Sequence, residues 1–439
     1  MNTTVWDRLA AHHREGSPAR LRVWDEETGE PPFDNRLVYR TMAAAAAPFR
    51  AGTRFRALPD VRFLVEDGWI GAPGDLLPGP EDSSAQEYDR RLDARLPDRG
   101  RLLSVEQPLL LDFGLWSRTR DLIAPLWQRI GCPVLPVVTE LLAGGGITVP
   151  ADPAVEATHA TLSFVLDGGL TARLRAAGAG DGDVRTFRAT AGDVVYRPAG
   201  CRDDVGYRPR TLVLRLRIPV DPRLLHRAVE DVVSGLLQER RYGADDAVPY
   251  LPCPPPGRRR DAAADVRPLA TTAAALGEEC AGPRLERVLR ILWARRASAG
   301  ALEPVPPPRQ GPPPEAGLRV RVTAQVLRMP DGDGWVWAVN GHAFAVRGQL
   351  GELLLERLRE DAAGAPTVDE LCGRLPVSAH AGVLALVRKL HALRAVELTD
   401  APADGPPKER EDAVERPSAV GEPASAVGGS PQPEKERTP

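Results

Sequence analysis

The sequence predicts an α+β protein with an antiparallel β-barrel or sandwich near the middle of the chain. Three observations favour this class. Residues 133–219 contain short alternating runs split by Gly, Pro and Asp turns, a spacing typical of a sandwich or barrel. Residues 220–302 change to an apolar helical periodicity. Residues 303–317, EPVPPPRQGPPPEAG, predict a stiff linker before a last, smaller domain.

The composition predicts more than one folded core and no general attraction to nucleic acid. The chain has 439 residues, of which 43% are apolar and 27% charged, so it is too apolar to be largely disordered. Its formal net charge is -3, which provides no global field for nucleic acid or an anionic membrane. We therefore expect neither as a partner.

Cysteine usage and the N-terminal residues predict a cytoplasmic location. The five cysteines form no C-x-x-C pair and are odd in number, which argues against a disulfide framework or a zinc knuckle. They are Cys132, Cys201, Cys253, Cys280 and Cys372. No apolar run has the length needed to span a bilayer, and MNTTVWDRLAAHHREG has no apolar signal core.

Residues 1–100 predict an α/β cover for the barrel. They combine strand-like runs with the segment PEDSSAQEYDRRLDARLPDRG, which predicts a solvated helix and loop. We expect the barrel domain over residues 101–219. Near its start, WSRTRDLIAPLWQRIG predicts a helix that covers a sheet and ends at Gly131 as its C-cap. The apolar stripe of this helix consists of Leu122, Ile123, Leu126 and Ile130.

Residues 220–302 predict a helical segment with an apolar stripe suited to pairing between two copies of the chain. The stripe consists of Leu224, Val229, Val232, Val233 and Leu236. A homodimer formed through residues 220–300 is therefore one expectation.

Residues 318–400 predict the order strand, strand, helix, helix, helix, strand, which is winged-helix-like. Thr367 and Glu370 have the spacing of a capping box, and Ser378 is the expected cap of the last helix. Residues 401–439 have no apolar periodicity and are expected to be disordered.

The last helix of this domain carries basic residues that could contact phosphates, which makes a DNA-binding regulator one alternative. These residues are Arg388, Lys389, His391 and Arg394. The helix also has interleaved leucines, which predict that much of it is core: Leu384, Leu386, Leu390 and Leu393.

Two further motifs lie in the barrel region, HATLSFVLDGG and GDVVYRPAGCRDDVGY. They follow the segment RGRLLSVEQPLLLDFGLWSRTRDLIAPLWQRIG and precede the helical segment. This order of segments resembles the JmjC-type cupins of the ribosomal-oxygenase group, over roughly residues 100–400. The resemblance implies a double-stranded β-helix (cupin or jelly-roll) barrel with a helical cover. It also implies Fe(II)- and 2-oxoglutarate-dependent hydroxylation of protein side chains.

The family pattern of the metal site is H-x-D-x-H-D-x-F-x-L-Q-x-x-G, followed by G-D-x-x-Y-x-P-x-G-x-x-H. The first two ligands and the last His bind Fe(II) in that family, and a basic residue after the first motif holds 2-oxoglutarate. Here Asp203 stands at the last His position, and aligning Gly168 with the first motif's glycine places Val155 and Ala157 at the other two ligand positions. The basic position is also not matched, although Arg173 follows a little downstream.

Valine and alanine donate no lone pair, so the three-ligand arrangement that suits Fe(II) is lost. We therefore predict no metal site and no cofactor. A rebuilt site remains an alternative, because alternation along a strand puts His159, Thr161 and Ser163 on the inward face, with Leu162, Phe164 and Leu166 on the other. In that alternative His159 faces Asp203 or Asp204 across the barrel mouth.

The residues predicted to line the barrel pocket are His159, Thr161, Ser163, Arg173, Tyr196, Asp203 and Asp204. Three of them also have a purely structural interpretation. His159 is then a polar residue at a strand end whose hydrogen bonds are satisfied within the fold, and Asp203 and Asp204 are turn formers. The leading prediction is a diverged or non-catalytic cupin that binds a peptide, a protein or a small molecule. The alternatives are an active oxygenase that uses Fe(II) and 2-oxoglutarate in a non-standard site, and the DNA-binding regulator.

Overall fold

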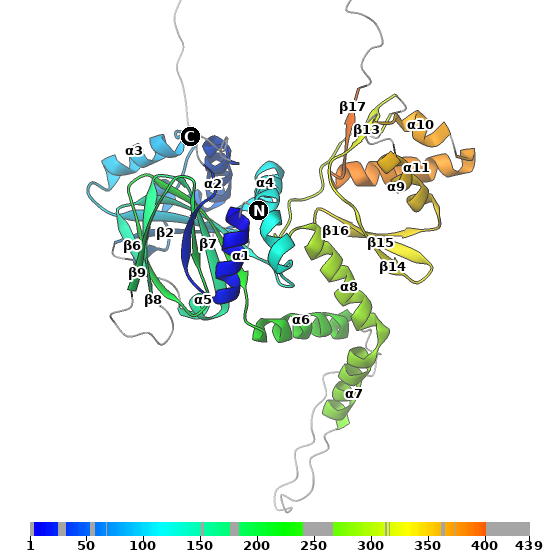
Figure 1. The fold of residues 1–439 in the computed structure, drawn as a ribbon, viewed down its shortest axis with the longest axis horizontal. Helices are drawn as coiled ribbons and strands as arrows, with labels where there is room; N and C mark the ends of the chain where they lie inside the picture. Colours follow the sequence, from blue (N-terminus) through cyan, green and yellow to red (C-terminus); the bar gives the residue numbers. More distant parts are fainter. Residues whose placement is uncertain are drawn as a thin grey trace, which may run out of the picture. The chain divides into compact units, whose positions relative to one another are not determined.

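The structure is a computed structural model that describes the chain between residues 4 and 400, with gaps (Figure 1). The described ranges are 4–24, 32–52, 58–66, 68–150, 153–175, 184–239, 267–311, 314–315, 317–360, 365–373 and 375–400. The tail predicted to be disordered, 401–439, lies outside them.

The larger sheet of the barrel is antiparallel and has eight strands in the order β1-β10-β7-β12-β5-β4-β2-β3. Their bounds are β1 Ala19–Arg22, β2 Asp60–Val65, β3 Gly68–Ile70, β4 Arg101–Glu106, β5 Val138–Gly145, β7 His159–Asp167, β10 Asp193–Arg197 and β12 Thr211–Pro219. The smaller sheet has four strands in the order β6-β11-β8-β9. These are β6 Ile147–Pro150, β8 Gly169–Arg175, β9 Val184–Thr190 and β11 Arg202–Tyr207.

The chain crosses repeatedly between the two sheets. It passes from β5 to β6, from β6 to β7 and from β7 to β8, then returns through β10, β11 and β12, so that several neighbouring strands, such as β7 and β12, are not consecutive in sequence. This winding of two antiparallel sheets around one core is a cupin-like jelly roll. The barrel predicted for the middle of the chain is therefore confirmed.

Strand β7 shows how the barrel separates two cores. Leu162, Phe164 and Leu166 belong to a large apolar cluster that includes residues of the covering helices, whereas Val165 belongs to the cluster between the two sheets. Successive side chains of a strand point to opposite faces, so one strand supplies both cores. The predicted facing of Leu162, Phe164 and Leu166 is confirmed.

Helices pack on the outer face of the larger sheet, and Figure 1 shows α1 and α4 beside β7. Their bounds are α1 Val5–Glu15, α2 Asn35–Arg50, α3 Ala85–Arg95 and α4 Phe113–Ile130, with short 3-10 turns η1 Gly74–Leu76 and η2 Pro108–Leu111. Helix α4 ends as predicted, with Gly131 as its C-cap at a φ of 91°.

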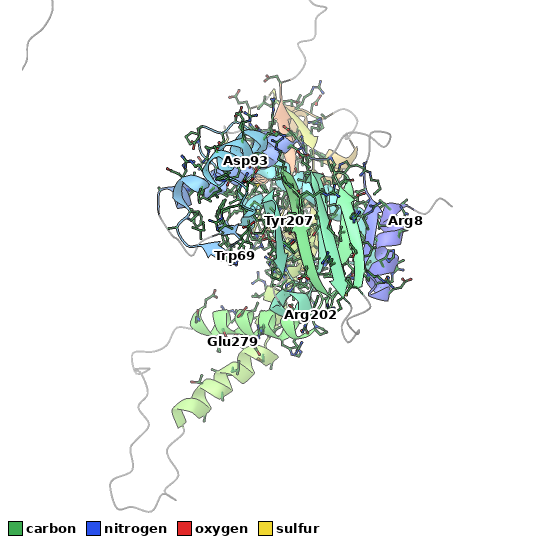
Figure 2. The ribbon with its side chains drawn as sticks, turned by 90° about the vertical axis from the view of Figure 1, so that its left-hand side faces the viewer. Arg8, Trp69, Asp93, Arg202, Tyr207 and Glu279 are labelled. Carbon is green, nitrogen blue, oxygen red and sulfur yellow. The ribbon has the colours of Figure 1, made fainter. Side chains whose placement is uncertain are left out.

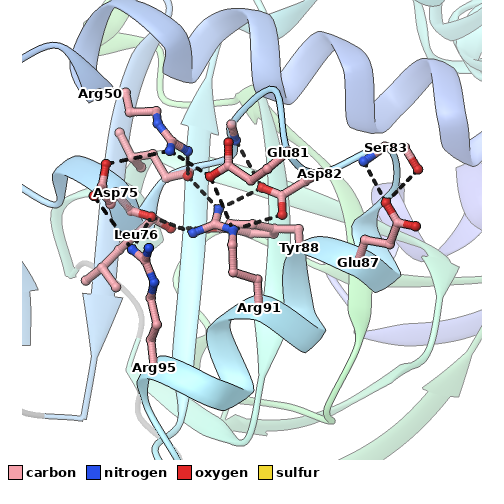
Figure 3. Close-up of polar contacts among 12 residues, drawn as sticks. Arg50, Asp75, Leu76, Glu81, Asp82, Ser83, Glu87, Tyr88, Arg91 and Arg95 are labelled. Carbon is pink, nitrogen blue, oxygen red and sulfur yellow. Dashed lines mark hydrogen bonds and ion pairs between the residues drawn. The ribbon is translucent and has the colours of Figure 1, made fainter.

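The charged segment before β4 is more tightly held than the predicted solvated helix and loop. Arg91 forms an ion pair of 2.7 Å with Asp82, whose carboxylate is buried, and Arg50 of α2 forms one of 2.6 Å with Glu81 (Figure 3). The hydroxyl of Tyr88 donates to the carbonyl of Leu76 at 2.8 Å. These long-range partners explain the difference, because a local pattern of charges does not reveal them.

Three helices follow the barrel: α6 Arg223–Glu239, α7 Arg267–Ala281 and α8 Pro283–Ser298. The C-terminal part contains strands β13 Arg319–Val322, β14 Leu327–Asp331, β15 Gly334–Val339, β16 His342–Arg347 and β17 Val396–Thr399. Its helices are α9 Leu350–Glu360, α10 Val368–Gly373 and α11 Val377–Ala392. None of the described helices is long and apolar enough to cross a membrane.

Of the two helix caps predicted in the C-terminal part, one is confirmed and one is wrong. The backbone N–H groups of Thr367 and Glu370 each donate to the other's side chain, at 2.7 and 3.2 Å, so the capping box is confirmed. The predicted cap at Ser378 is wrong, because α11 already begins at Val377 and Pro376 is its N-cap. Proline favours the start of a helix, since its missing N–H is not needed there.

Candidate functional site

The inward face of the larger sheet carries a row of polar side chains at one end of the barrel. Across the strands, Ser163 of β7 lies opposite Arg215 of β12, which lies opposite Glu140 of β5. Glu140 in turn lies opposite Glu106 of β4. On one face of an antiparallel sheet, direct partners are close enough for their side chains to interact.

Glu140 is the centre of this row. Its carboxylate accepts a hydrogen bond from the Ser104 hydroxyl at 2.6 Å and one from the guanidinium of Arg215 at 3.3 Å. Burial alone would raise the pKa of Glu140, but the charges of Arg215 and Arg217 and the bond from Ser104 outweigh it and hold the pKa below its ordinary value. Glu140 is therefore a carboxylate at neutral pH.

Three arginines, which we call the barrel-mouth arginines, lie on this face: Arg197, Arg215 and Arg217. Arg215 also donates to the hydroxyl of Tyr207 from the opposite sheet. Arg217 donates to Glu106 at 2.5 Å, and its buried Nε has no hydrogen-bond partner among the described residues.

Arg197 is the most enclosed of the barrel-mouth arginines, with 4% of its surface exposed. It donates to the hydroxyl of Thr161 at 2.8 Å and to the carbonyl of Cys201 at 2.9 Å. Thr161 lies opposite both Arg197 and Arg217 in register, so the predicted pocket residue is part of an arginine network.

His159 begins β7 at the edge of this network. Its Nδ1 lies 2.8 Å from the hydroxyl of Thr158. Burial lowers the pKa of His159, and the nearby charges of Arg217 and Arg197 lower it further. The imidazole is therefore neutral at physiological pH, and the potential around it is positive.

Tyr196 does not line the barrel interior, contrary to the prediction. Its ring is 2% exposed and belongs to the core beneath the covering helices, and its hydroxyl lies 3.1 Å from Nδ1 of His13 on α1. The neighbouring Val195 is the residue that faces the interior cluster. Alternation along β10 therefore sends Tyr196 to the opposite face.

Arg173 and Asp204 also lie away from the barrel interior. They are direct partners on β8 and β11, and both are exposed, whereas Ala172 and Val205 beside them are buried between the sheets. The prediction that Asp204 faces His159 across the mouth is therefore wrong. The backbone of Asp203 pairs with Leu174, and its side chain lies outside the described part of the structure.

The two remaining positions aligned with metal ligands do not lie on a strand. Val155 and Ala157 fall in helix α5, Pro153–Thr158, and β7 begins only after them, at His159. Proline at the first helical position and alanine within the helix favour this local structure.

These residues do not fit the Fe(II) that the resembled family uses. Among the residues that the structure describes, no group of three or more His, Cys, Asp or Glu side chains could hold a metal ion. At the barrel mouth the His159 imidazole has Arg197 and Arg217 near it, and their charges oppose a divalent cation. A facial triad requires three donors on one side of the metal.

The barrel-mouth arginines and their glutamate partners were missed in the sequence. The signal was present in RTLVLRLRIPV, where Arg215 and Arg217 alternate with leucines. In a strand whose leucines pack under helices, the arginines must enter the barrel. Their partners could not be read locally, because Glu106 and Glu140 lie 111 and 75 residues away in sequence.

Comparisons with known proteins agree with the fold. No family model and no curated protein matches the chain. The structure of YcfD, a ribosomal oxygenase from Escherichia coli, in complex with cobalt and 2-oxoglutarate has a TM-score of 0.50 and 14% sequence identity, covering 90% of this chain and 98% of that one. Another crystal structure of YcfD has a TM-score of 0.49 and 15% identity, covering 91% and 99%. The chain therefore has the cupin-like fold of that oxygenase.

Proposed function

We propose that this chain is a non-catalytic cupin-like protein whose barrel mouth binds an anionic group of a peptide, a protein or a small molecule. One observation carries the proposal: among the described residues that form these contacts on the inward face, arginines outnumber carboxylates. Arg197, Arg215 and Arg217 supply three positive charges, and Glu106 and Glu140 supply two negative charges, which leaves one positive charge in excess among these five residues.

Two of the barrel-mouth arginines can be reached by a ligand. The side chains of Arg215 and Arg217 are 21% and 18% exposed. A guanidinium binds a carboxylate through two parallel hydrogen bonds, which gives both affinity and orientation. A carboxylate on a small molecule or on a peptide is therefore the favoured anion.

Thermal unfolding of the full chain with succinate, 2-oxoglutarate or phosphate tests this proposal. A ligand that binds only the folded state raises the melting temperature, and we expect a dicarboxylate to do so. Arg217→Gln is expected to abolish the shift, whereas Arg321→Gln, at an exposed position of β13, keeps it. A shift that survives in Arg217→Gln, or no shift with any of the anions, would contradict the proposal.

The alternative is an active oxygenase with a rebuilt site around His159 and Asp203. It is supported by the fold shared with a ribosomal oxygenase that was crystallised with cobalt and 2-oxoglutarate. The positive potential around His159 argues against it. Metal binding and its loss in His159→Ala separate the two proposals.

We propose that the C-terminal part is a winged helix that serves in packing. Helices α9, α10 and α11 share its apolar core with β13 and β17, and these two strands pair with each other. Basic residues near the last helix are engaged within the chain: Lys389 lies over the ring of Phe344 at 5.8 Å and Arg394 over that of Phe113 at 4.4 Å. These contacts hold two of the four basic residues against rings of the chain itself, which argues against the DNA-binding alternative.

We also propose a homodimer through the helices after the barrel. Val233 and Leu236 of α6 are buried, but Val229 on the same predicted stripe is 40% exposed. Trp293 of α8 is 42% exposed, which is unusual for so large an apolar side chain. A second copy of the chain would cover these side chains.

A further inference from the structure

The outer face of the smaller sheet has a groove that is separate from the barrel interior. Figure 2 faces this sheet, with the labelled Arg202 and Tyr207 at the two ends of β11. Two hollows of about 530 and 440 Å³ lie on it, and Arg173 and Asp204 line both of them. We call these joined hollows the small-sheet groove.

Among the described residues, the small-sheet groove is lined by five arginines and one carboxylate. The arginines are Arg173, Arg175, Arg188, Arg202 and Arg208, and the carboxylate is Asp204. The whole chain has a net charge of -3, so this concentration of positive charge is local. Such a local excess attracts an anionic partner.

The arrangement of these arginines also indicates a ligand. Arg202 and Arg175 are direct cross-strand partners, a placement of like charges that destabilises a sheet. The side chains of Arg173, Arg188 and Arg202 are exposed and make no hydrogen bond or ion pair with any residue that the structure describes. An extended anion along the groove would neutralise several of them at once.

Asp204 distinguishes between two kinds of anion. It lies beside Arg173 in the middle of the groove, so a bound chain must pass close to its carboxylate. A phosphodiester backbone has no hydrogen-bond donor for a carboxylate, whereas every residue of a peptide except proline has a backbone N–H. Binding of single-stranded nucleic acid also relies on exposed aromatic rings, and Tyr207, which lines the groove, is buried.

We propose that the small-sheet groove binds an acidic, extended segment of a partner protein. The distance along β11 from Arg202 to Arg208 is about 20 Å at the usual rise of a strand, which accommodates about six residues of extended peptide. Carboxylates of the segment pair with Arg173, Arg188 and Arg202, and one of its backbone N–H groups donates to Asp204. This site is independent of the anion site proposed for the barrel mouth.

Fluorescence anisotropy of fluorescein-labelled octaglutamate, titrated with the full-length chain, tests this inference. We expect saturable binding that weakens with added salt. Arg173→Glu combined with Arg202→Glu is expected to weaken it at least about a hundredfold, from about tenfold for each lost charge-assisted contact. Arg188→Glu alone is expected to weaken it about tenfold and provides a second variant if the double variant does not fold.

Two controls make the result specific. Arg8→Glu removes an exposed arginine of α1, labelled in Figure 2, and is expected to change binding little. Octathymidylate of similar charge is expected to bind more weakly than octaglutamate. The inference is overturned if octaglutamate does not bind, if the double variant and Arg188→Glu bind as the wild type does, or if octathymidylate binds more tightly. Succinate binding at the barrel mouth is unaffected by these variants, so the two proposals fail separately.

Discussion

Arg215 lies directly opposite Glu140 on neighbouring strands of the barrel, and its guanidinium donates to that carboxylate at 3.3 Å. The pair is held on the inward face, where Ser104 and Tyr207 satisfy further atoms of the two side chains. A buried ion pair of this kind is expensive to break, because the remaining charge keeps its desolvation cost without its partner. The pair itself is neutral, so the excess positive charge of the barrel mouth comes from the other two barrel-mouth arginines, Arg197 and Arg217.

Glu140→Gln tests the role of this pair in stability. The substitution leaves Arg215 without its carboxylate partner, so we expect the free energy of unfolding to fall by about 3 kcal/mol. Urea denaturation followed by circular dichroism measures the loss. Asp331→Asn is the control, since it removes the partner of Arg287 in an exposed pair and is expected to change stability little. An equal effect of both substitutions would show that the inward pair has no special role.

The pH dependence of stability tests the environment of His159. Its pKa lies below the ordinary 6.5 in the folded chain, so the unfolded chain takes up the proton first as the pH falls. The stability that neutral His159 provides is therefore present at neutral pH and decreases as the pH falls through about 6.5. We expect the melting temperature of His159→Gln to depend less on pH between 7.5 and 5.5 than that of the wild type. Identical profiles would contradict the assigned environment.

Tyr196→Phe separates the outer core from the barrel mouth. The substitution removes a buried hydroxyl that contacts His13 and keeps the ring, so we expect a loss of about 1 kcal/mol in the free energy of unfolding. Because Tyr196 packs beneath the covering helices, binding of a dicarboxylate to the barrel mouth is expected to be unchanged. A loss of dicarboxylate binding in Tyr196→Phe would contradict this placement and would support the predicted position of Tyr196 in the barrel pocket.

Val229→Asp tests the proposed dimer. A charge in the middle of an apolar interface is costly, so light scattering after size-exclusion chromatography is expected to give a dimer for the wild type and a monomer for the variant. The exposed position of Val229 in one copy means that the fold itself tolerates the change. A wild-type monomer would contradict the proposal.

The sequence allowed the barrel and the facing of β7 to be predicted, because strand alternation is a local property. Leu162 and Phe164 could be assigned to one face and Ser163 to the other without knowledge of their partners. Tyr196 was assigned to the wrong face, since the face that is inward on β10 depends on its pairing with β7. Local sequence does not specify that register.

The polar network at the barrel mouth could not be predicted, because its pairs come from strands that are far apart in the chain. Arg217 meets Glu106 only after the sheet has assembled. Helix α5 was missed for the opposite reason: Val155 and Ala157 were interpreted only through their alignment with the family motif, and the local preference of PAVEAT for helix was not considered. The resemblance predicted the fold and misplaced the positions that would carry metal.

The most direct test of the central claim is anaerobic titration of the full-length chain with Fe(II), followed by calorimetry, beside the same titration of His159→Ala. A barrel mouth with an excess of arginine is expected to bind no stoichiometric Fe(II), and the two proteins are expected to give the same trace. Tight binding of one equivalent of Fe(II) by the wild type, lost in His159→Ala, would contradict the account and establish a rebuilt metal site.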